Sequence, residues 1–360
     1  MKILHVLYTP RAEGTVKLTL DWLTLSRFDQ EVLVLNPKPA EMTEELKRRA
    51  AWFVQGDKFP VGLTKFPWIL AKVRQVCRQR RPDLVICWSN GFSPWVLGGA
   101  RLAGVRRLVT HAGNPPTWTS WGKAHTVIST LVAWLTGGRM VCCSHYVAGE
   151  FARSPGACAS VLRVVYNCAP VSSIREEAVS ARAQRKDHHP RIIMVATLEL
   201  HKDHATLLKA MPAVLRAVPT VQLWMVGDGS QRQRLESLSA SLGLAEAVTF
   251  LGSRRDVPAL LGQSDVFVFS TTREEGLGTV LIEALAAGLP IVASDVPACH
   301  EALAAGRWGT LVPPSDPTAM AAALIASLQT PAVAEADERS DYLQQFSPAR
   351  MIADYVAATV

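Results

Sequence analysis

Short apolar runs alternate along the chain with longer stretches in which apolar residues recur every three or four positions. In the first half, the runs that predict β-strands are 2–8, 31–35, 84–87, 108–110, 140–143 and 162–165. The stretches that predict helices between them are 15–26, 41–50, 66–80, 94–103, 125–136 and 145–152. Strands that alternate with helices in this way predict a parallel sheet covered by helices.

The second half of the chain repeats this alternation. Its predicted strands lie near 191–195, 221–226, 247–250, 265–269 and 290–293. Its predicted helices lie near 203–217, 231–242, 256–262, 278–287 and 316–328. Two successive blocks of this kind predict an α/β protein with two doubly wound, Rossmann-like parallel-sheet domains.

The boundary between the two blocks is predicted from composition. Residues 171–190 are polar, mixed in charge and end in His-His-Pro, which is typical of a linker. This interpretation gives a first domain over 1–170 and a second over 191–346. A last helix is expected within 347–360, after Ser347-Pro348.

Composition indicates a chain that is folded throughout. Hydrophobic residues make up 49% of the 360 residues and charged residues 19%, and there is no low-complexity tract. The apolar stretch 3–8 is too short for the core of a signal peptide, and no apolar run approaches the about 18 residues of a membrane span. Seven cysteines without a C-x-x-C pair favour buried thiols in a reducing compartment. We therefore expect a cytoplasmic protein.

Charge is unevenly distributed along the chain. Residues 1–170 carry 22 Lys and Arg against 10 Asp and Glu, whereas residues 171–360 carry 16 against 21. Eight of the ten tryptophans also lie in the first half. This half is expected to face an anionic surface, either membrane lipid on the inner face of the membrane or a lipid-linked phosphate acceptor. Because no zinc-finger spacing or RNA-binding aromatic pattern is present, no nucleic-acid partner is expected.

A glycine loop follows the predicted strand near 265–269. Gly276 and Gly278 allow a ligand to approach the backbone closely, and a helix that opens near Gly278 offers unpaired N–H groups to a phosphate. Glu275 and Glu283 flank the loop, where each carboxylate can reach a hydroxyl-bearing part of a nucleotide sugar. The simpler alternative is an ordinary strand–turn–helix whose glutamates face water.

The segment 270–301 resembles the retaining nucleotide-sugar glycosyltransferases of family 4. The resemblance rests on the spacing of Glu275 and Glu283, the Gly-Leu-Gly at 276–278, and the sequences Glu-Ala-Leu-Ala-Ala-Gly-Leu-Pro and Ala-Ser-Asp-Val-Pro that follow. It implies the GT-B fold, in which two Rossmann-like domains face each other across a cleft. It further implies that 191–346 binds the donor, that 1–170 binds the acceptor, and that the last helix crosses back to the first domain.

The resemblance also implies roles for individual residues. Lys202 would contact the donor diphosphate, Glu275 would position the sugar and Glu283 would bind the ribose. The loop from Gly276 through Leu277 and Gly278 to Thr279 would bind the phosphates through its backbone. His111 would lie near the donor sugar, although a structural histidine is the alternative. The remaining predicted donor contacts are Gly14, Gly227 and Arg254.

Two loops depart from the family pattern. Ala196-Thr197 stands where relatives carry Gly-Arg, so one cation for the diphosphate is missing. Glu13-Gly14 stands where relatives often have paired glycines. These departures keep a non-enzymatic alternative open, a donor-binding accessory subunit without turnover. A second alternative is a sugar-nucleotide epimerase.

The resemblance implies a reaction that needs no cofactor or metal. The chain contains no D-x-D pair of the type that holds a divalent metal on a diphosphate. His201 and His204 have the spacing of a metal pair without a third ligand nearby, so we interpret them as histidines of a loop and a helix start. We expect transfer from a nucleoside diphosphate sugar to a hydroxyl acceptor. The basic, Trp-rich half points to a growing bacterial surface polysaccharide or a lipid-linked oligosaccharide as that acceptor.

A second basic stretch, from Lys47 to Arg81, leaves two interpretations open. Its aromatic residues and interspersed lysines and arginines are typical of an interfacial membrane patch. They equally fit one helix packed on the core through Ile69, Val73 and Val76 with its basic residues in water. Trp118 and Trp121, in the loop predicted after His111, are placed to meet an acceptor.

Overall fold

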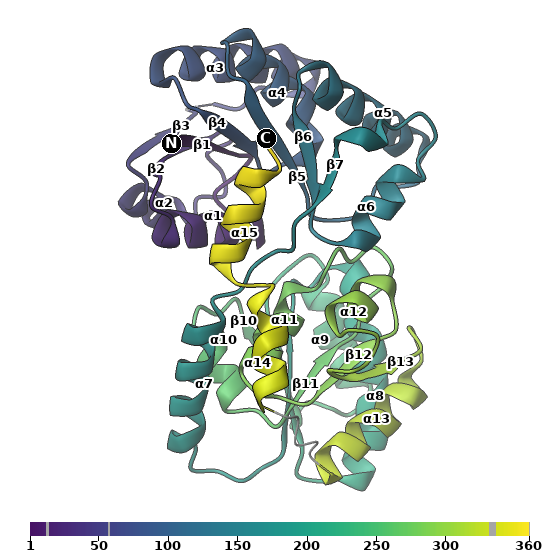
Figure 1. The fold of residues 1–360 in the computed structure, drawn as a ribbon. Helices are drawn as coiled ribbons and strands as arrows, with labels where there is room; N and C mark the ends of the chain where they lie inside the picture. The colour runs from purple at the N-terminus through teal and green to yellow at the C-terminus, as the bar shows by residue number, and fades with distance from the viewer. Residues whose placement is uncertain (12–13, 57, 331–335, 360) are drawn as a thin grey trace. The chain divides into compact units, whose positions relative to one another are not determined.

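The computed structural model describes residues 1–11, 14–56, 58–330 and 336–359, and these residues form two compact units (Figure 1). Unit 1 contains Met1–Cys168 and Pro348–Val360, and unit 2 contains Ala169–Ser347. Each unit is a parallel sheet with helices on both faces, so the predicted fold class is confirmed. No helix among these residues has both the length and the apolar character needed to cross a membrane.

The described residues of unit 1 form a seven-stranded sheet in the order β3-β2-β1-β4-β5-β6-β7. All of its strand pairs are parallel. The strands are β1 (Lys2–Leu7), β2 (Asp29–Val34), β3 (Trp52–Gln55), β4 (Leu84–Cys87), β5 (Arg107–Ala112), β6 (Arg139–Cys142) and β7 (Leu162–Val164). Strand β3 was not predicted, because it is a four-residue edge strand whose side chains are only half buried.

The helices of unit 1 follow the sequence prediction to within a few residues. They are α1 (Gly14–Leu25), α2 (Thr43–Arg49), α3 (Lys65–Arg80), α4 (Ser93–Leu102), α5 (Ser120–Leu135), α6 (His145–Ala152) and α15 (Pro348–Ala357), with short 3₁₀ turns at Gly62–Thr64, Asn90–Phe92 and Ala159–Val161. Helix α15, the last of the chain, packs on α1 (Figure 1). Its Met351 and Tyr355 are buried in the core of unit 1.

A polar group is buried at the centre of this core. His5 lies on β1, and its Nε2 is 2.8 Å from the side-chain oxygen of Gln30. The indole N–H of Trp88 donates to Nδ1 of the same ring over 3.0 Å. Because Nδ1 accepts this hydrogen bond, it carries no proton, and burial lowers the pKa of the ring to about 4 although the hydrogen bond with Gln30 raises it.

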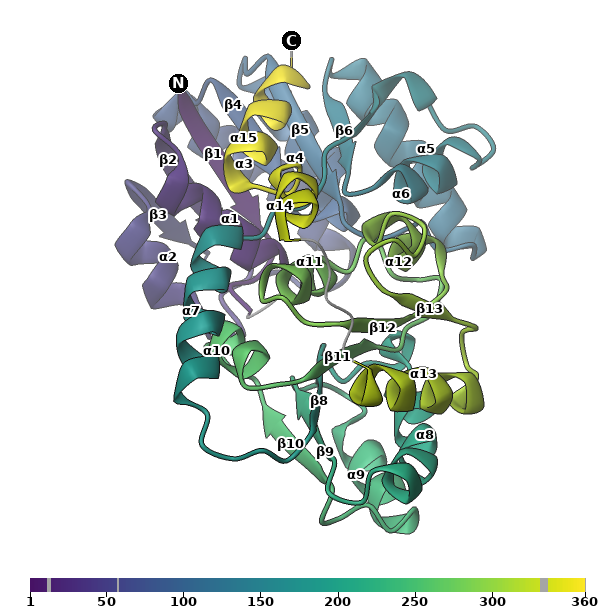
Figure 2. The ribbon, with the colours of Figure 1, turned by 60° about the horizontal axis from the view of Figure 1, so that its bottom comes forward.

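The described residues of unit 2 form a six-stranded parallel sheet in the order β10-β9-β8-β11-β12-β13 (Figure 2). Its strands are β8 (Arg191–Val195), β9 (Gln222–Val226), β10 (Val248–Gly252), β11 (Val266–Phe269), β12 (Ile291–Ser294) and β13 (Thr310–Val312). Its helices are α7 (Val171–Gln184), α8 (His204–Ala217), α9 (Arg232–Ser241), α10 (Val257–Gly262), α11 (Thr279–Ala286), α12 (Pro297–Ala302), α13 (Pro317–Gln329) and α14 (Ala336–Gln344), and the 3₁₀ turn η4 (Leu200–Lys202) precedes α8. Helix α7 packs on α10, and α13 packs on α8.

The predicted linker over 171–190 is a helix for most of its length. Helix α7 buries Ile174, Ala178 and Ala181 and exposes its charged residues. The backbone of Ala178 lies so close to α10 that a side chain at Gly262 would come within 2.2 Å of its carbonyl oxygen. The segment is therefore a packed part of unit 2. Only three of its residues are buried and two of these are alanines, so the polar composition concealed the helical spacing.

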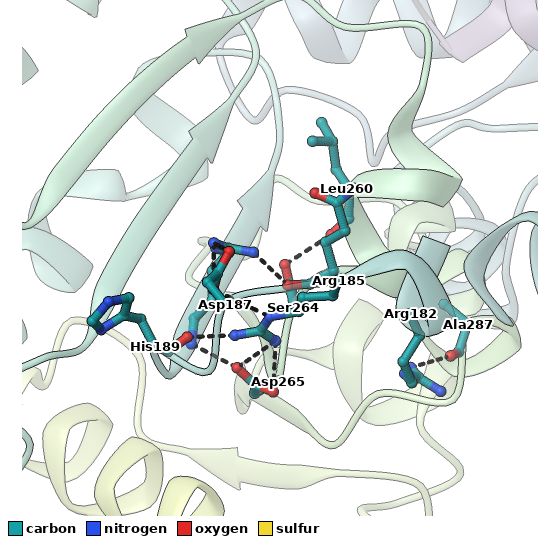
Figure 3. A network of polar contacts seen from close by, with 10 residues as sticks. Arg182, Arg185, Asp187, His189, Leu260, Ser264, Asp265 and Ala287 are labelled. Carbon is teal, nitrogen blue, oxygen red and sulfur yellow. Dashed lines mark hydrogen bonds and ion pairs between the residues drawn. The ribbon is translucent and has the colours of Figure 1, made fainter. Parts of the chain in front are cut away.

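The remainder of this segment is fixed to the sheet by charged groups (Figure 3). The guanidinium of Arg185 donates to both carboxylate oxygens of Asp265 over 2.9 and 3.0 Å. The same carboxylate accepts the backbone N–H of Arg191 over 2.8 Å. Arg182, within α7, donates to the carbonyl oxygen of Ala287 over 2.9 Å. These contacts hold the start of β8 in place, where composition alone predicted a linker.

Candidate functional site

Backbone contacts join the loop after β11 to the turn η4 in unit 2. The N–H of Thr272 and the hydroxyl of Thr271 both donate to the carbonyl oxygen of His201, over 2.9 and 3.0 Å. The N–H of Thr271 also donates to the hydroxyl of Ser294 at the end of β12, over 3.1 Å. Segments 70 residues apart in sequence are thereby held side by side. Sequence reasoning missed Thr271 and Ser294, because no motif marks a residue that only positions a neighbour.

This arrangement brings Lys202 and Glu275 into contact. The ammonium of Lys202 forms an ion pair with Oε2 of Glu275 and lies 5.2 Å from the centre of the Phe269 ring. The two side chains are 16% and 8% exposed, so solvent screens the pair only weakly. The structure therefore brings together two of the three predicted catalytic residues.

The carboxylate of Glu275 is kept ionised by its surroundings. Burial opposes its ionisation, but the charge and hydrogen bond of Lys202 and the N–H of Gly276 outweigh burial and lower its pKa below the ordinary value. The N–H of Gly276 donates to Oε1 over 3.1 Å. With Oε1 and Oε2 both engaged, this buried group is a fixed hydrogen-bond acceptor.

Helix α11 begins directly after the loop. Gly278 precedes it with φ 72°, and a side chain there would lie 3.1 Å from Leu281 and 3.2 Å from Phe269. Glycine is therefore required both by the backbone conformation and by packing. The first N–H groups of a helix have no partner within it, so the start of α11 at Thr279 offers donors and a positive dipole end to an anion. Leu277 is 1% exposed and anchors this loop in the core.

Glu283 lies within α11 and is 6% exposed, although the residues around it on this helix are apolar. A carboxylate is seldom buried on an apolar helix without a specific role. Its assignment to the ribose stays a prediction.

Gly227 and Arg254 have local structural roles. A side chain at Gly227 would lie 1.9 Å from the carbonyl oxygen of Ala196, and its φ is 137°, so glycine lets the ends of β8 and β9 approach each other. Arg254 is exposed and forms two hydrogen bonds with Asp256, of 2.8 and 2.5 Å. Contacts of either residue with a donor stay predictions.

The histidines around Lys202 are not arranged as a metal site. No group of three or more His, Cys, Asp or Glu side chains with metal-binding geometry occurs among the residues that the structure describes. His204 is 3% exposed, and burial lowers its pKa to about 3. Asp203 directly precedes α8, where its side chain makes no capping bond to a backbone N–H. Its carboxylate instead accepts the hydroxyls of Thr206 and Ser315 over 2.8 and 3.2 Å.

His111 lies near the end of β5 in unit 1 and is 2% exposed. Its Nδ1 is 2.7 Å from the hydroxyl of Tyr355, and its Nε2 has no hydrogen-bond partner among the described residues. A side chain at Gly113 would come within 3.0 Å of that Nε2, so glycine keeps the space beside it open. Burial lowers the pKa of His111 to about 4, which makes the ring neutral at pH 7.

The other residues predicted in unit 1 lie on its surface or in its packing. Gly14 is the exposed first residue of α1, no atom lies within 4 Å of a side chain placed there, and Glu13 lies outside the described residues. Helix α3, in the stretch from Lys47 to Arg81, buries Ile69, Val73 and Val76, which supports the core-packed interpretation of that helix. Trp118 and Trp121 are 50% and 72% exposed.

The sequence of this chain is similar to a known family and to individual proteins. Residues 189–330 match the family described as Glycosyl transferases group 1. The chain is 40% identical over 139 residues to a phosphatidyl-myo-inositol mannosyltransferase of Mycobacterium leprae, an alignment covering 38% of this chain and 36% of that protein. It is 27% identical over 311 residues to a GDP-mannose-dependent alpha-(1-6)-phosphatidylinositol monomannoside mannosyltransferase of Mycolicibacterium smegmatis, covering 82% of this chain and 80% of that protein.

The fold is similar to that of HepE from Anabaena, solved in complex with UDP and glucose. The TM-score is 0.82 at 19% identity, with 99% of each chain covered. Two parallel-sheet Rossmann-like units with this likeness define a protein of the GT-B fold. The sequence matches add a likeness to the group 1 glycosyltransferases over residues 189–330, which make up most of unit 2.

Proposed function

We propose that this glycosyltransferase moves a hexose from a nucleoside diphosphate donor to a hydroxyl group of a lipid-linked acceptor. The observation that carries the proposal is the ion pair of Lys202 and Glu275 beside the start of α11. This part of unit 2 combines three groups: the cation of Lys202, the carboxylate of Glu275 as a fixed acceptor for sugar hydroxyls, and the unpaired backbone N–H groups at the start of α11 as donors to a phosphate. These are the groups that a sugar joined to a diphosphate requires.

The reaction is proposed to proceed with retention at the anomeric carbon. The acceptor hydroxyl attacks from the side that the diphosphate leaves, the bond to the phosphate oxygen breaks, and that oxygen takes the proton. Lys202 and the backbone at Gly278 and Thr279 stabilise the negative charge on the departing phosphate. The ammonium and the helix start supply this charge stabilisation, so we propose a reaction without a metal or other cofactor.

Similarity suggests which donor and acceptor to test first. The mannosyltransferase of Mycolicibacterium smegmatis makes GDP-mannose the first donor to test and phosphatidylinositol monomannoside the first acceptor. With such an acceptor, we propose that the enzyme works at the cytoplasmic face of the membrane. The basic excess of residues 1–170 supports an anionic lipid surface as partner and does not require nucleic acid.

A donor panel tests this proposal. Purified protein is unfolded thermally with GDP, UDP, GDP-mannose, UDP-glucose and each base alone, and only a matched nucleotide is expected to raise the unfolding temperature appreciably. Transfer of labelled sugar to a mixed glycolipid extract then identifies turnover. Conversion of donor without acceptor would indicate the epimerase alternative. Binding without any turnover would indicate an accessory subunit and would refute the transferase proposal.

A further inference from the structure

Helix α5 is amphipathic in the reverse of the usual sense. The residues that it buries are small or polar: Gly122, Thr126, Ser129, Thr130 and Ala133. The residues that it exposes include the large apolar ones: Trp121 at 72%, Ile128 at 42%, Leu131 at 40%, Trp134 at 57% and Leu135 at 64%. A surface helix of a globular protein normally turns its apolar side to the core.

The inward polar groups are satisfied within the helix itself. The hydroxyl of Thr126 donates to the carbonyl oxygen of Gly122 over 3.0 Å, and that of Thr130 donates to the carbonyl of Thr126 over 2.9 Å. The small inner face lets α5 lie close to α4 and to the 3₁₀ turn at Ala159–Val161 without large apolar side chains between them. Its large apolar residues are thus left for the outer surface.

The exposed apolar residues form one continuous stripe. Trp121, Ile128, Leu131 and Leu135 follow each other at the three-, four- and seven-residue intervals that share one helix face. Trp118, 50% exposed, precedes the helix at one end, and Trp134 flanks the stripe at the other. Of the exposed large apolar residues in the part of the chain that the structure describes, only Val179 and Leu200 belong to unit 2.

The chain around α5 carries positive charge without any negative charge. Residues 84–149 contain no Asp or Glu, and their basic residues are Arg101, Arg106, Arg107, Lys123 and Arg139. The ammonium of Lys123 lies 5.9 Å from the ring centre of Trp118, at the start of the helix. Because the sheet is parallel, the end of α5 lies near the starts of β5 and β6, where Arg107 and Arg139 stand. Both ends of the apolar stripe therefore have basic residues nearby.

We propose that this α5 face, made of Trp118, Trp121, Ile128, Leu131, Trp134 and Leu135, docks on an anionic bilayer surface. Tryptophans at the ends and aliphatic residues between them are the composition of a helix lying in the membrane interface. The absence of acidic residues over 84–149 complements anionic headgroups. A symmetric contact with a second copy would place like charges together, which disfavours a dimer through this face. The inference rests on the proposed lipid-linked acceptor, because docking would bring the enzyme to that substrate.

Co-sedimentation of the full-length protein with vesicles tests the surface. Vesicles of phosphatidylcholine with phosphatidylglycerol are expected to bind the protein more strongly than vesicles of phosphatidylcholine alone, and salt is expected to weaken this preference. The triple variant Ile128→Ser/Leu131→Ser/Leu135→Ser is expected to lose about tenfold or more in vesicle affinity for each side chain that inserts. Lys123→Glu is expected to reduce only the salt-sensitive part of the vesicle affinity.

Matched variants keep this test specific. Leu25→Ser changes a 53% exposed leucine on α1, and Arg216→Glu changes an exposed arginine on α8. Neither variant is expected to alter vesicle binding. The triple variant is expected to keep its unfolding temperature and its stabilisation by nucleoside diphosphate, because its residues are exposed.

Three outcomes would overturn the inference. The first is a wild-type protein that responds to nucleotide but binds neither kind of vesicle, which would leave the transferase proposal standing. The second is a triple variant that binds vesicles like the wild type. The third is a wild-type dimer that becomes monomeric in the triple variant with vesicle binding unchanged, which would make the face a contact between copies. Failure of the transferase proposal is separate, since it appears as absent donor binding or turnover in solution.

Discussion

The hydroxyl of Tyr355 lies 2.7 Å from Nδ1 of His111, although the two residues are 244 positions apart in sequence. No other acceptor for this hydroxyl occurs among the described residues, and burial raises the pKa of Tyr355 well above its usual range, so the phenol keeps its proton and donates it. The proton of the neutral imidazole is then on Nε2. Helix α15, the last helix of the chain, thus determines which nitrogen of His111 can donate to a ligand.

Tyr355→Phe is expected to remove the hydrogen bond that keeps the proton of His111 on Nε2. The ring keeps its packing against Trp22 and Trp88, and the loss of one hydrogen bond is expected to cost about 1 kcal/mol of unfolding free energy. Nitrogen chemical shifts of His111 are expected to change from a single Nε2–H tautomer to a mixture. Tyr342→Phe in unit 2, which loses a 2.9 Å bond to the carbonyl of Ala302, is the control for a stability loss alone. Unchanged shifts in Tyr355→Phe would contradict the assignment.

Buried histidines are expected to make the protein acid-sensitive. Burial lowers the pKa of His5 and His111 to about 4 and that of His204 to about 3. In the unfolded chain these groups take up protons below about pH 6.5, whereas in the folded protein they stay neutral down to the lowered values. Stability is therefore complete above the unfolded pKa and falls as the pH decreases towards the folded pKa. Each histidine contributes a slope of at most about 1.4 kcal/mol per pH unit.

Urea unfolding between pH 7 and pH 4 measures this slope. The transition of unit 1 is expected to be the steeper function of pH, because it contains two of the three histidines. His204→Gln is expected to reduce the slope for unit 2 and to leave unit 1 unchanged. A stability independent of pH in this range would show that these imidazoles are not neutral by burial.

The parts of the fold that the sequence predicted are those in which local pattern and tertiary burial agree. Strand β11, and β8 after Arg191, are continuous apolar runs because both faces of their sheet are covered. Helix α11 begins directly after Gly278, where packing requires a glycine. Helix α7 was missed because its buried residues are few and small within a charged stretch. Helix α5 begins five residues earlier than predicted, since the hydroxyl of Thr119 caps it by accepting the N–H of Gly122.

Within the candidate site, the sequence located the glutamates and the lysine but not their contact. A pair separated by 73 residues forms because the carbonyl of His201 accepts two donors of the loop after β11, and no local pattern encodes that register. The contact of Tyr355 with His111 is likewise not encoded by any local pattern. The exposed side of α5 was equally hidden, because its spacing is that of an ordinary core helix. Which face is buried depends on the neighbours of the helix and not on the helix alone.

Lys202→Ala is expected to have two effects. Loss of the cation next to the departing phosphate is expected to reduce kcat/KM by on the order of 3 kcal/mol of transition-state stabilisation. Glu275 is also left buried without its ion pair, so its pKa is expected to rise and unfolding free energy to fall by about 1–3 kcal/mol. Steady-state kinetics and denaturation measure the two effects. Lys209→Ala, an exposed lysine on α8, is the control, and near-parental kinetics in Lys202→Ala would mean that another cation serves the phosphate.

Glu275→Ala and Glu283→Ala are expected to impair transfer by different routes. If Glu275 positions the sugar as proposed, removing its carboxylate is expected to lower kcat, because that contact would orient the reacting carbon. Removing the carboxylate at 283 is expected mainly to raise donor KM, because a ribose contact binds ground state and transition state alike. Kinetics with varied donor separate the two. Parental values for both variants at unchanged stability would remove these residues from the site.

Two glycines with the same predicted role are expected to respond oppositely to alanine. At Gly227 the added methyl group would lie 1.9 Å from the carbonyl oxygen of Ala196 at a φ of 137°, so Gly227→Ala is expected to cost on the order of 3 kcal/mol of unfolding free energy. At Gly14 no atom lies within 4 Å of that position, and alanine favours the helix, so Gly14→Ala is expected to stabilise by at most about 1 kcal/mol. Denaturation of both variants measures this contrast, and donor kinetics add a second readout. A raised donor KM in the stable Gly14→Ala protein would indicate that phosphate approaches the start of α1 closely, whereas an unchanged KM would remove Gly14 from the donor site.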